Sequence, residues 1–234
     1  MKKQVVWGIM ALCGLVSTGL AEIIYPQNNG FEVTNQVVAA KINYVSQTNT
    51  VTSPGWTLYG GGANSQLVAV VANGWVGLSG NNNITNRNSD GTTSTYGQAI
   101  MLRAGDGKYT NAALSSAYIA ADFTLSQAYT NVTVQFDYRI RAAASGGIIH
   151  SWIVSTNGTV WDMGTKQQNT TNFVTFVSSG ANIATNLTAG TYKLYLVGEA
   201  PSGGWSSSHA VMLDNVQINA IPEPARKLSL VIIN

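Results

Sequence analysis

Acidic and histidine side chains are the groups in this sequence that could carry out catalysis. A glycosidase needs two carboxylates on either side of a cleft, and nothing in the spacing of the acidic residues selects such a pair. Those within expected strands are Asp122, Asp137, Asp162 and Glu199. His150 and His209 are 59 residues apart, and the sequence has no H-E-x-x-H, H-x-H, cysteine cluster or G-x-S-x-G. We therefore expect a non-enzymatic protein, with a secreted glycan-active enzyme as the alternative.

Tryptophan side chains are the second group of candidates, because sugar C–H faces stack on aromatic rings while polar neighbours bind the hydroxyl groups. The Asn157-Gly158 dipeptide predicts a two-residue hairpin turn, which would place Trp161 opposite Val154. Trp152 would then share a face with Trp161 as its diagonal neighbour. Apolar residues occupy the same face, so burial of both rings in the core is the favoured interpretation, and a glycan platform is the alternative.

Trp205 and Arg139 are the other two residues that we expect to contact a ligand. Trp205 lies in the Gly- and Ser-rich stretch 201–208, where no strand neighbour would bury its ring. Arg139 lies beside Asp137 on the polar side of the expected strand 132–141 and could line a binding surface. Ordinary cross-strand ion pairs are the alternative role for these polar side chains.

Apolar residues alternate with polar ones through much of the chain, as in strands that have one face buried. Charged residues make up only 9% of the sequence, and five of its 24 glycines lie in Asn-Gly and Asp-Gly turn dipeptides. This many short strands predicts an all-β fold, a single antiparallel β-sandwich of the jelly-roll kind. The strands are expected near 31–38, 56–59, 66–72, 98–103, 116–125, 132–142, 148–155, 159–163, 172–178, 190–199 and 210–220.

The stretch 132–141 shows the alternation most clearly, and we expect one of its faces to lie in the core and the other in solvent. The inward residues are Val132, Val134, Phe136, Tyr138 and Ile140. The outward residues are Thr133, Gln135, Asp137, Arg139 and Arg141. The stretch 190–196 repeats this arrangement, with Tyr192, Leu194 and Leu196 inward.

The N-terminus has the pattern of an export signal. Met1-Lys2-Lys3 form a basic start, the 16 residues Val5–Leu20 carry no charge, and the small residues Gly19 and Ala21 suit a signal peptidase. We therefore expect residues 1–21 to be a signal peptide that is removed after Ala21. A membrane anchor is the alternative, and the short apolar run disfavours it because a span needs ~20 residues.

Removal of this signal changes the charge of the chain. Taking residues 1–21 from the 234-residue chain leaves 213 residues with ten Lys/Arg and ten Asp/Glu, because Lys2 and Lys3 are lost. No net positive charge remains to bind nucleic acid or anionic lipid. No cysteine remains either, so stability must come from an apolar core, supplemented by a metal ion if one is bound.

The C-terminus carries an expected strand followed by Ile221-Pro222-Glu223-Pro224-Ala225. Together with the export signal, this tail resembles the PEP-CTERM class of exported bacterial proteins. The resemblance implies that residues 221–234 are a sorting tag read by an exosortase-type enzyme, and that the protein is secreted or held at the cell surface. The apolar run Leu228–Ile233 is too short for a span, and the basic pair Arg226-Lys227 precedes it. We therefore expect a truncated tag and a released product.

Five short motifs between residues 29 and 220 form a second pattern. They are Asn29-Gly30-Phe31-Glu32, Gly55-Trp56, Val134-Gln135-Phe136-Asp137-Tyr138-Arg139, Ala189-Gly190-Thr191-Tyr192 and Leu213-Asp214-Asn215-Val216. These motifs resemble those of galactose-binding-like jelly rolls, a group that includes many carbohydrate-binding modules. The resemblance implies a structural calcium where the first and last strands meet, with Glu32 and Asp214 among its ligands.

The position of Asp214 gives that site independent support. Asp214 shares strand parity with Met212, Val216 and Ile218, which would aim its carboxylate toward the apolar side of the strand. A buried carboxylate needs a cation or several donors, and calcium prefers oxygen ligands. The alternative is a bulge at Asp214-Asn215, in which backbone N–H groups cap the carboxylate.

The two resemblances together predict an exported protein in which residues 22–220 form one domain that binds extracellular polysaccharide without catalysis. A structural or adhesive matrix protein without sugar specificity is the alternative. Structural Ca²⁺ is the one cofactor expected. Signal peptidase and an exosortase are the partners implied during export, and no nucleic-acid partner is expected.

Overall fold

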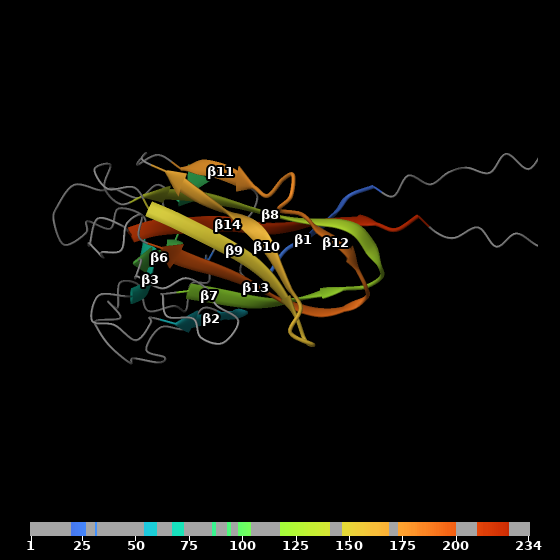
Figure 1. The fold of residues 1–234 in the computed structure, drawn as a ribbon. Coiled ribbons are helices and arrows are strands. Elements are labelled where there is room, and N and C mark those ends of the chain that lie inside the picture. Colours follow the sequence, from blue (N-terminus) through green and yellow to red (C-terminus); the bar gives the residue numbers. More distant parts are fainter. Residues whose placement is uncertain are drawn as a thin grey trace, which may run out of the picture.

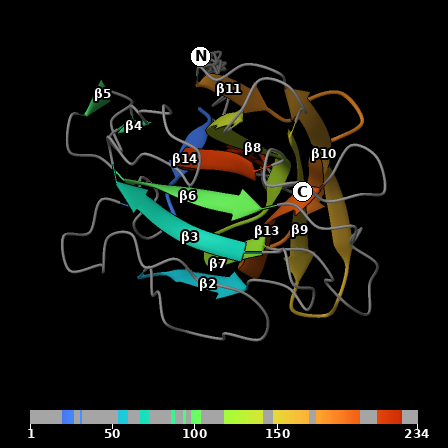
Figure 2. The same cartoon turned by 90° about the vertical axis from the view of Figure 1, so that its left-hand side faces the viewer.

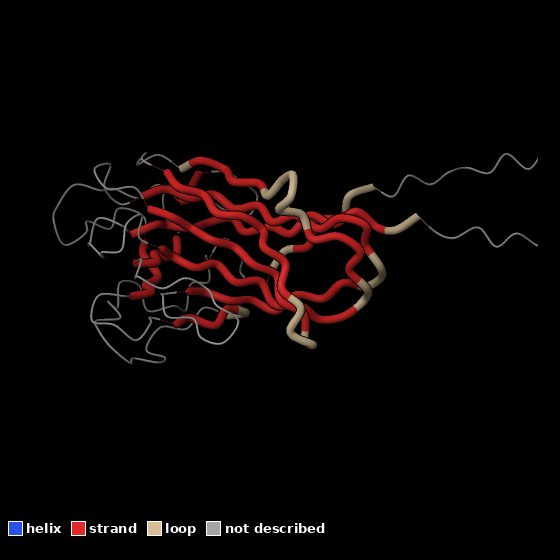
Figure 3. Tube along the Cα trace, viewed as in Figure 1, coloured by secondary structure: helices blue, strands red, loops and turns tan. Residues whose placement is uncertain are grey.

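The structure is a computed structural model, and it describes residues 20–26, 31, 54–59, 67–72, 86–87, 93–94, 98–103, 118–140, 147–168, 173–199 and 210–224. These residues form strands joined by turns and loops, as Figure 3 shows. None of them belongs to a helix that is long and apolar enough to cross a membrane.

Two antiparallel sheets pack face to face, which makes the fold an all-β sandwich (Figures 1 and 2). The larger sheet contains β1 (Glu22–Ile24), β3 (Leu67–Ala72), β6 (Gln98–Arg103), β8 (Tyr129–Ile140), β11 (Val174–Val177), β12 (Ala184–Leu187) and β14 (Ala210–Pro222). Its strand order is β11-β8-β14-β6-β3, with β1 added to β14 and β12 added to β8.

The smaller sheet has five strands in a single order. They are β2 (Trp56–Tyr59), β7 (Tyr118–Leu125), β9 (Gly147–Ser155), β10 (Val160–Gln168) and β13 (Gly190–Glu199). They are arranged as β10-β9-β13-β7-β2, so that β13 lies in the middle, with β9 on one side and β7 on the other. A separate hairpin pairs β4 (Asn86–Arg87) with β5 (Thr93–Ser94).

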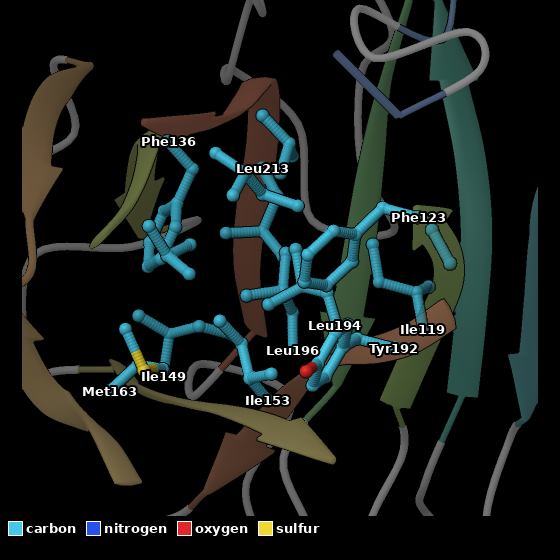
Figure 4. Close-up of a cluster of buried hydrophobic side chains, with 14 of the residues drawn as sticks. Ile119, Phe123, Phe136, Ile149, Ile153, Met163, Tyr192, Leu194, Leu196 and Leu213 are labelled. Atoms are coloured by element: carbon cyan, nitrogen blue, oxygen red, sulfur yellow. The ribbon is translucent and has the colours of Figure 1, made fainter. Parts of the chain in front are cut away.

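The hydrophobic core lies between the two sheets and takes side chains from strands of both (Figure 4). On β8, the five residues expected to face inward are at most 1% exposed, so this part of the sequence prediction is confirmed. On β13, Tyr192, Leu194 and Leu196 belong to the same core cluster, also as expected. Complete burial of one large apolar side chain stabilises a fold by ~1.5–3 kcal/mol.

The expected strands that fall on described residues are all present. Four short strands were missed, namely β1, β4, β5 and β12. β1 has only three residues, and β12 contains Asn186 with a positive φ of 56°, which interrupts the extended backbone on which an alternation pattern depends. Most of the expected strand 31–38 lies outside the described residues, although Phe31 is fully buried and packs 5.2 Å from the Trp56 ring.

Strand β1 is joined to the larger sheet by a side-chain hydrogen bond as well as by its ladder. Glu22 is the Cα partner of Ala220 on β14. The Tyr129 hydroxyl, at the start of β8, donates to the Glu22 carboxylate and also lies 3.3 Å from the Ser126 hydroxyl. Because Tyr129 is fully buried, its hydroxyl depends on these partners.

Replacing Glu22 should therefore weaken the fold. We expect Glu22→Ala to lower the free energy of unfolding by about 1 kcal/mol, because the Tyr129 hydroxyl loses its charged acceptor. Glu22→Gln keeps an acceptor oxygen and should lose less. Glu223→Ala, which removes an exposed carboxylate just after the C-terminal end of β14, is the matched control. Equal urea midpoints for Glu22→Ala and Glu223→Ala would contradict the assignment.

Tyr138 gives the opposite expectation, because its fully buried hydroxyl has no hydrogen-bond partner among the residues that the structure describes. Tyr138→Phe should raise the free energy of unfolding by about 1 kcal/mol, since an unsatisfied polar group leaves the core. Burial also raises the pKa of Tyr138 to about 12. An unfolded phenol ionises near pH 10, so the wild type should lose stability as the pH rises from about 10 to about 12.

The phenylalanine variant has no such group and should not show that alkaline component. Urea unfolding of both proteins at several pH values measures the difference directly. A Tyr138→Phe protein that is less stable at pH 7, with an unchanged alkaline profile, would show that the hydroxyl is satisfied.

Candidate functional site

The outward face of the five-stranded sheet carries four aromatic side chains. Side chains alternate between the two faces of a strand, and each of these four has a sequence neighbour that lies in the core cluster or packs against it. They are Tyr59 on β2, Tyr118 on β7, Tyr195 on β13 and Trp152 on β9. We call this set the aromatic strip.

The strip crosses four adjacent strands. Tyr59 is the Cα partner of Tyr118, and Tyr195 is the Cα partner of Trp152. Ring centroids are 4.9 Å apart for Tyr59 and Tyr118 and 5.6 Å apart for Tyr118 and Tyr195. The three tyrosines are half-buried, whereas Trp152 is only 5% exposed. The tyrosine rings therefore offer the accessible part of the strip, and Trp152 supports it.

His150 and Asp162 form a polar end to the strip. The His150 ring packs on Trp152 with centroids 3.6 Å apart. His150 Nε2 lies 3.0 Å from Asp162 Oδ1, which also accepts the Gly164 backbone N–H at 2.8 Å. The side chain of His150 is 17% exposed and that of Asp162 is 57% exposed. The carboxylate is thus held in place while much of it still faces solvent.

A second polar pair lies beside the strip on β7 and β13. Lys193 Nζ is 3.3 Å from Asp122 Oδ1, and both side chains are more than a third exposed, at 37% and 65%. An exposed pair of this kind contributes little to stability. Both groups can therefore exchange partners with a ligand at small cost.

The hydroxyl of Tyr118 is a hydrogen-bond donor at neutral pH. Burial raises its pKa, and the neighbouring Tyr195 and Tyr59 raise it further. The phenol therefore stays protonated. The outward face combines flat apolar rings with phenol donors and carboxylate acceptors, which is the chemistry that a sugar ring requires.

The acidic residues of this face are too far apart to act together on a glycosidic bond. Asp122 and Asp162 lie on β7 and β10, which are separated by β13 and β9. Three interstrand steps of ~4.8 Å place their backbones roughly 14 Å apart. Paired glycosidase carboxylates are about 5–9.5 Å apart. Of the other two candidates, Asp137 belongs to the other sheet, and Glu199 ends β13 six residues after Lys193, the Cα partner of Asp122.

The expected pairing of Trp152 and Trp161 on one face is wrong. The turn has three residues, 156–158, closed by hydrogen bonds between Ser155 and Thr159, and Gly158 adopts φ 88°. Trp161 therefore lies opposite Ile153, not Val154, and the two tryptophans take opposite faces. Trp161 packs against the core cluster, with its ring 6.0 Å from that of Tyr192. Only Trp152 remains on the outward face.

Arg139 is not on a solvent-facing surface either. It is 5% exposed, and its neighbour Asp137 is 2% exposed, so the expectation that this side of β8 is wet is wrong for both. The Arg139 guanidinium carbon lies 5.8 Å from the Phe173 ring centroid. Burial lowers the pKa of Arg139.

Around Asp137 the larger sheet holds a chain of side-chain hydrogen bonds, which we call the polar network. Asp137 accepts from the Thr175 hydroxyl at 2.5 Å and from Asn215 Nδ2 at 3.2 Å. Asn215 in turn accepts from Gln217 at 3.2 Å, and Gln217 accepts from Gln135 at 3.4 Å. These groups satisfy one another within the protein.

Asp214 lies on this same outward side, which corrects the parity argument. A bulge between Asp214 and Gln217, with Asn215 at φ 52°, returns Val216 and Ile218 to the core and leaves Asp214 opposite Asp137. Asp214 is fully buried, and its Oδ1 accepts the Asn215 backbone N–H at 2.7 Å. The bulge and backbone cap are thus the alternative that the sequence left open.

The sequence predicts that Glu32 and Asp214 bind calcium. Glu32 lies outside the described residues, as does Trp205. Among the residues that are described, no three His, Cys, Asp or Glu side chains gather as metal ligands. Two facing buried carboxylates do need positive charge nearby, and their oxygens suit calcium, whereas Arg139 on the same side of β8 offers an alternative cation.

The tyrosines of the strip were missed by sequence reasoning, although part of the signal was there. Tyr195 has the opposite parity to Leu194 and Leu196 within an expected strand, so alternation alone turns it outward. Tyr118 is related to Ile119 in the same way. That these rings meet follows only from the order of strands in the sheet, which the alternation pattern does not contain.

No protein-family model and no curated protein matches the chain. An arabinose-bound α-L-arabinofuranosidase structure matches 84% of this chain and 26% of its own, at 10% identity and a TM-score of 0.47. The CBM22-2 xylan-binding domain of Xyn10C from Paenibacillus barcinonensis matches 72% of this chain and 93% of its own, at 10% identity and a TM-score of 0.43. The C-terminal family 22 carbohydrate-binding module of Clostridium thermocellum Xyn10B matches 75% and 91%, at 11% identity and a TM-score of 0.41.

The chain therefore spans about a quarter of the arabinofuranosidase and most of the two binding modules.

A melting experiment tests the calcium prediction. If calcium binds only the folded state, calcium at a hundred times its dissociation constant should add about 2.7 kcal/mol to the free energy of unfolding. Asp214→Asn should remove that gain, and Asp122→Asn, at an exposed carboxylate, should keep it. An unchanged midpoint for the wild type in chelator and in calcium would rule out the site.

Proposed function

We propose that this protein binds carbohydrate through the aromatic strip of its five-stranded sheet. The observation that carries the proposal is the row of three half-buried tyrosines on adjacent strands, backed by Trp152. A large outward aromatic surface with polar residues at its edges is a common mark of a binding site.

The direction of the strip favours an extended chain over a single sugar. The aromatic residues run across the strands, and the centroids of neighbouring tyrosines lie 4.9 and 5.6 Å apart. Several consecutive sugar units can therefore each meet a ring, while Asp162 and the pair of Asp122 with Lys193 accept or donate hydrogen bonds from hydroxyl groups. The proposed ligand is an internal stretch of a polysaccharide.

The proposal includes export of the protein, which two features of the sequence support. The basic start, apolar run and small residues of 1–21 support a signal peptide, and the tail 221–234 supports a sorting tag of the PEP-CTERM type. A protein so directed meets polysaccharide outside the cell. Recovery of most of the protein in washed membranes, and not in the culture medium, would contradict release.

Ring removal tests the binding surface. Tyr118→Ala and Tyr195→Ala should each raise the dissociation constant for a retained polysaccharide about tenfold or more, since loss of a central aromatic anchor typically costs over 1 kcal/mol. Tyr118→Phe keeps the ring and should keep most of the affinity. A glycan array on the wild type selects the polysaccharide, and affinity electrophoresis measures each variant.

Tyr25→Ala is the matched control, because Tyr25 is a 51% exposed tyrosine beyond β1 on the other sheet. Far-UV circular dichroism and melting of each variant separate loss of binding from loss of fold. Wild-type protein that retains no glycan on the array would favour the adhesive or matrix role. Full retention by Tyr118→Ala and Tyr195→Ala would place binding elsewhere on the molecule.

A further inference from the structure

A groove separates the edge strands of the two sheets on the side where β10 faces β11. Its volume is about 340 Å³, which lies within the range of small-ligand sites. Both strands are at the ends of their sheets, so the groove opens between the layers of the sandwich. Its lining includes Thr165, Lys166, Phe176, Val177, Ser179 and Asn182.

The groove has a fixed wall near Asn182. Asn182 Nδ2 donates to the Asp162 carbonyl at 3.2 Å, and its backbone N–H donates to the Ser179 carbonyl at 3.1 Å. Gly164 has φ 101°, and a Cβ at that position would lie 3.3 Å from the Asn182 side chain. The glycine therefore permits the close approach that shapes this wall.

The lining combines apolar side chains with hydroxyl groups, and a sugar ring likewise combines apolar C–H faces with hydroxyl groups. Phe176, which is partly buried, supplies apolar surface and is anchored on Phe136 with ring centroids 4.8 Å apart. The hydroxyl groups of Thr165 and Ser179 supply donors and acceptors on exposed residues. Rings of this kind pack on C–H faces while hydroxyls bind hydroxyls.

The charge of the groove is positive. Its nine lining residues include Lys166 and no aspartate or glutamate. Lys166 is exposed and takes part in no ion pair in the part of the chain that the structure describes. Two carboxylates are hydrogen-bonded to lining residues and are already engaged, Asp162 by His150 and Gly164, and Asp137 by Thr175 and Asn215.

We infer that this groove is a second carbohydrate site, distinct from the aromatic strip, and that it takes an anionic sugar unit. The carboxylate of a uronic acid or the sulfate of a sulfated sugar pairs with Lys166, and the ring lies against Phe176. Thr165 lines the groove and is the Cα partner of His150 at the end of the strip. One acidic polysaccharide can therefore reach both sites.

Isothermal titration with defined probes tests the inference. Trigalacturonate should bind with a dissociation constant about tenfold lower than that of the uncharged galactotriose of the same linkage, because a charge-assisted hydrogen bond is added. The preference should fall as salt is raised. A sulfated galactotriose distinguishes a uronate site from a sulfate site, and a preference for either supports an anionic sugar.

Substitutions locate the effect. Lys166→Gln should abolish the preference for the charged trisaccharide, Lys166→Arg should keep it, and Gln167→Ala, an exposed neighbour that does not line the groove, should leave it unchanged. Tyr195→Ala should weaken polysaccharide retention through the strip and keep the preference in the groove. Loss of binding at one site can therefore be distinguished from loss of binding at the other.

Three results would overturn the inference. The first is equal affinity of the wild type for the charged and uncharged trisaccharides. The second is a preference that survives Lys166→Gln. The third is inorganic sulfate that binds as tightly as the charged trisaccharides, which would show a simple anion site without recognition of a sugar.

Discussion

Burial of the apolar sheet faces against each other is the constraint from which the rest of the structure follows. On β13, a slip of one residue would expose Tyr192, Leu194 and Leu196 and turn Tyr195 inward. Each fully buried side chain of this size is worth ~1.5–3 kcal/mol, so such a slip costs several kcal/mol on one strand alone. The outward rings are thus held in position by the core behind them.

Two bulges modify this rule, and each re-aims functional side chains. On β10 the extra residue Met163 enters the core, so that Asp162 still faces outward beside Trp152. On β14 the bulge after Asp214 turns Val216 inward and leaves the carboxylate on the polar side. A bulge inserts one residue while the ladder continues on both sides of it. The extra residue changes which side chains of the strand face the core and which face outward.

The sequence predicted the features that depend on local alternation of residues. It did not predict the features that depend on the order of strands in a sheet. Strict alternation in 132–140 and 190–196 predicted both strands and their inward faces, because a period of two leaves one way to bury the apolar side. The Asn157-Gly158 dipeptide suits a three-residue loop as well as a two-residue one, and that single residue moved Trp161 to the other face. The strip was beyond reach because its residues come from β2, β7, β9 and β13, whose adjacency no local pattern encodes.

The polar side chains on the outward faces of the two sheets differ in burial and in hydrogen bonding. This difference decides where a ligand can bind. In the polar network of the larger sheet, Asp137 and Asn215 are buried and already hydrogen-bonded to neighbours. A sugar hydroxyl would have to displace those partners and would leave a buried group unsatisfied, which costs about 1–3 kcal/mol. On the smaller sheet Asp162 and Asp122 are more than half exposed. Much of each carboxylate faces solvent, so a ligand there can gain hydrogen bonds without displacing the protein groups already bound to it.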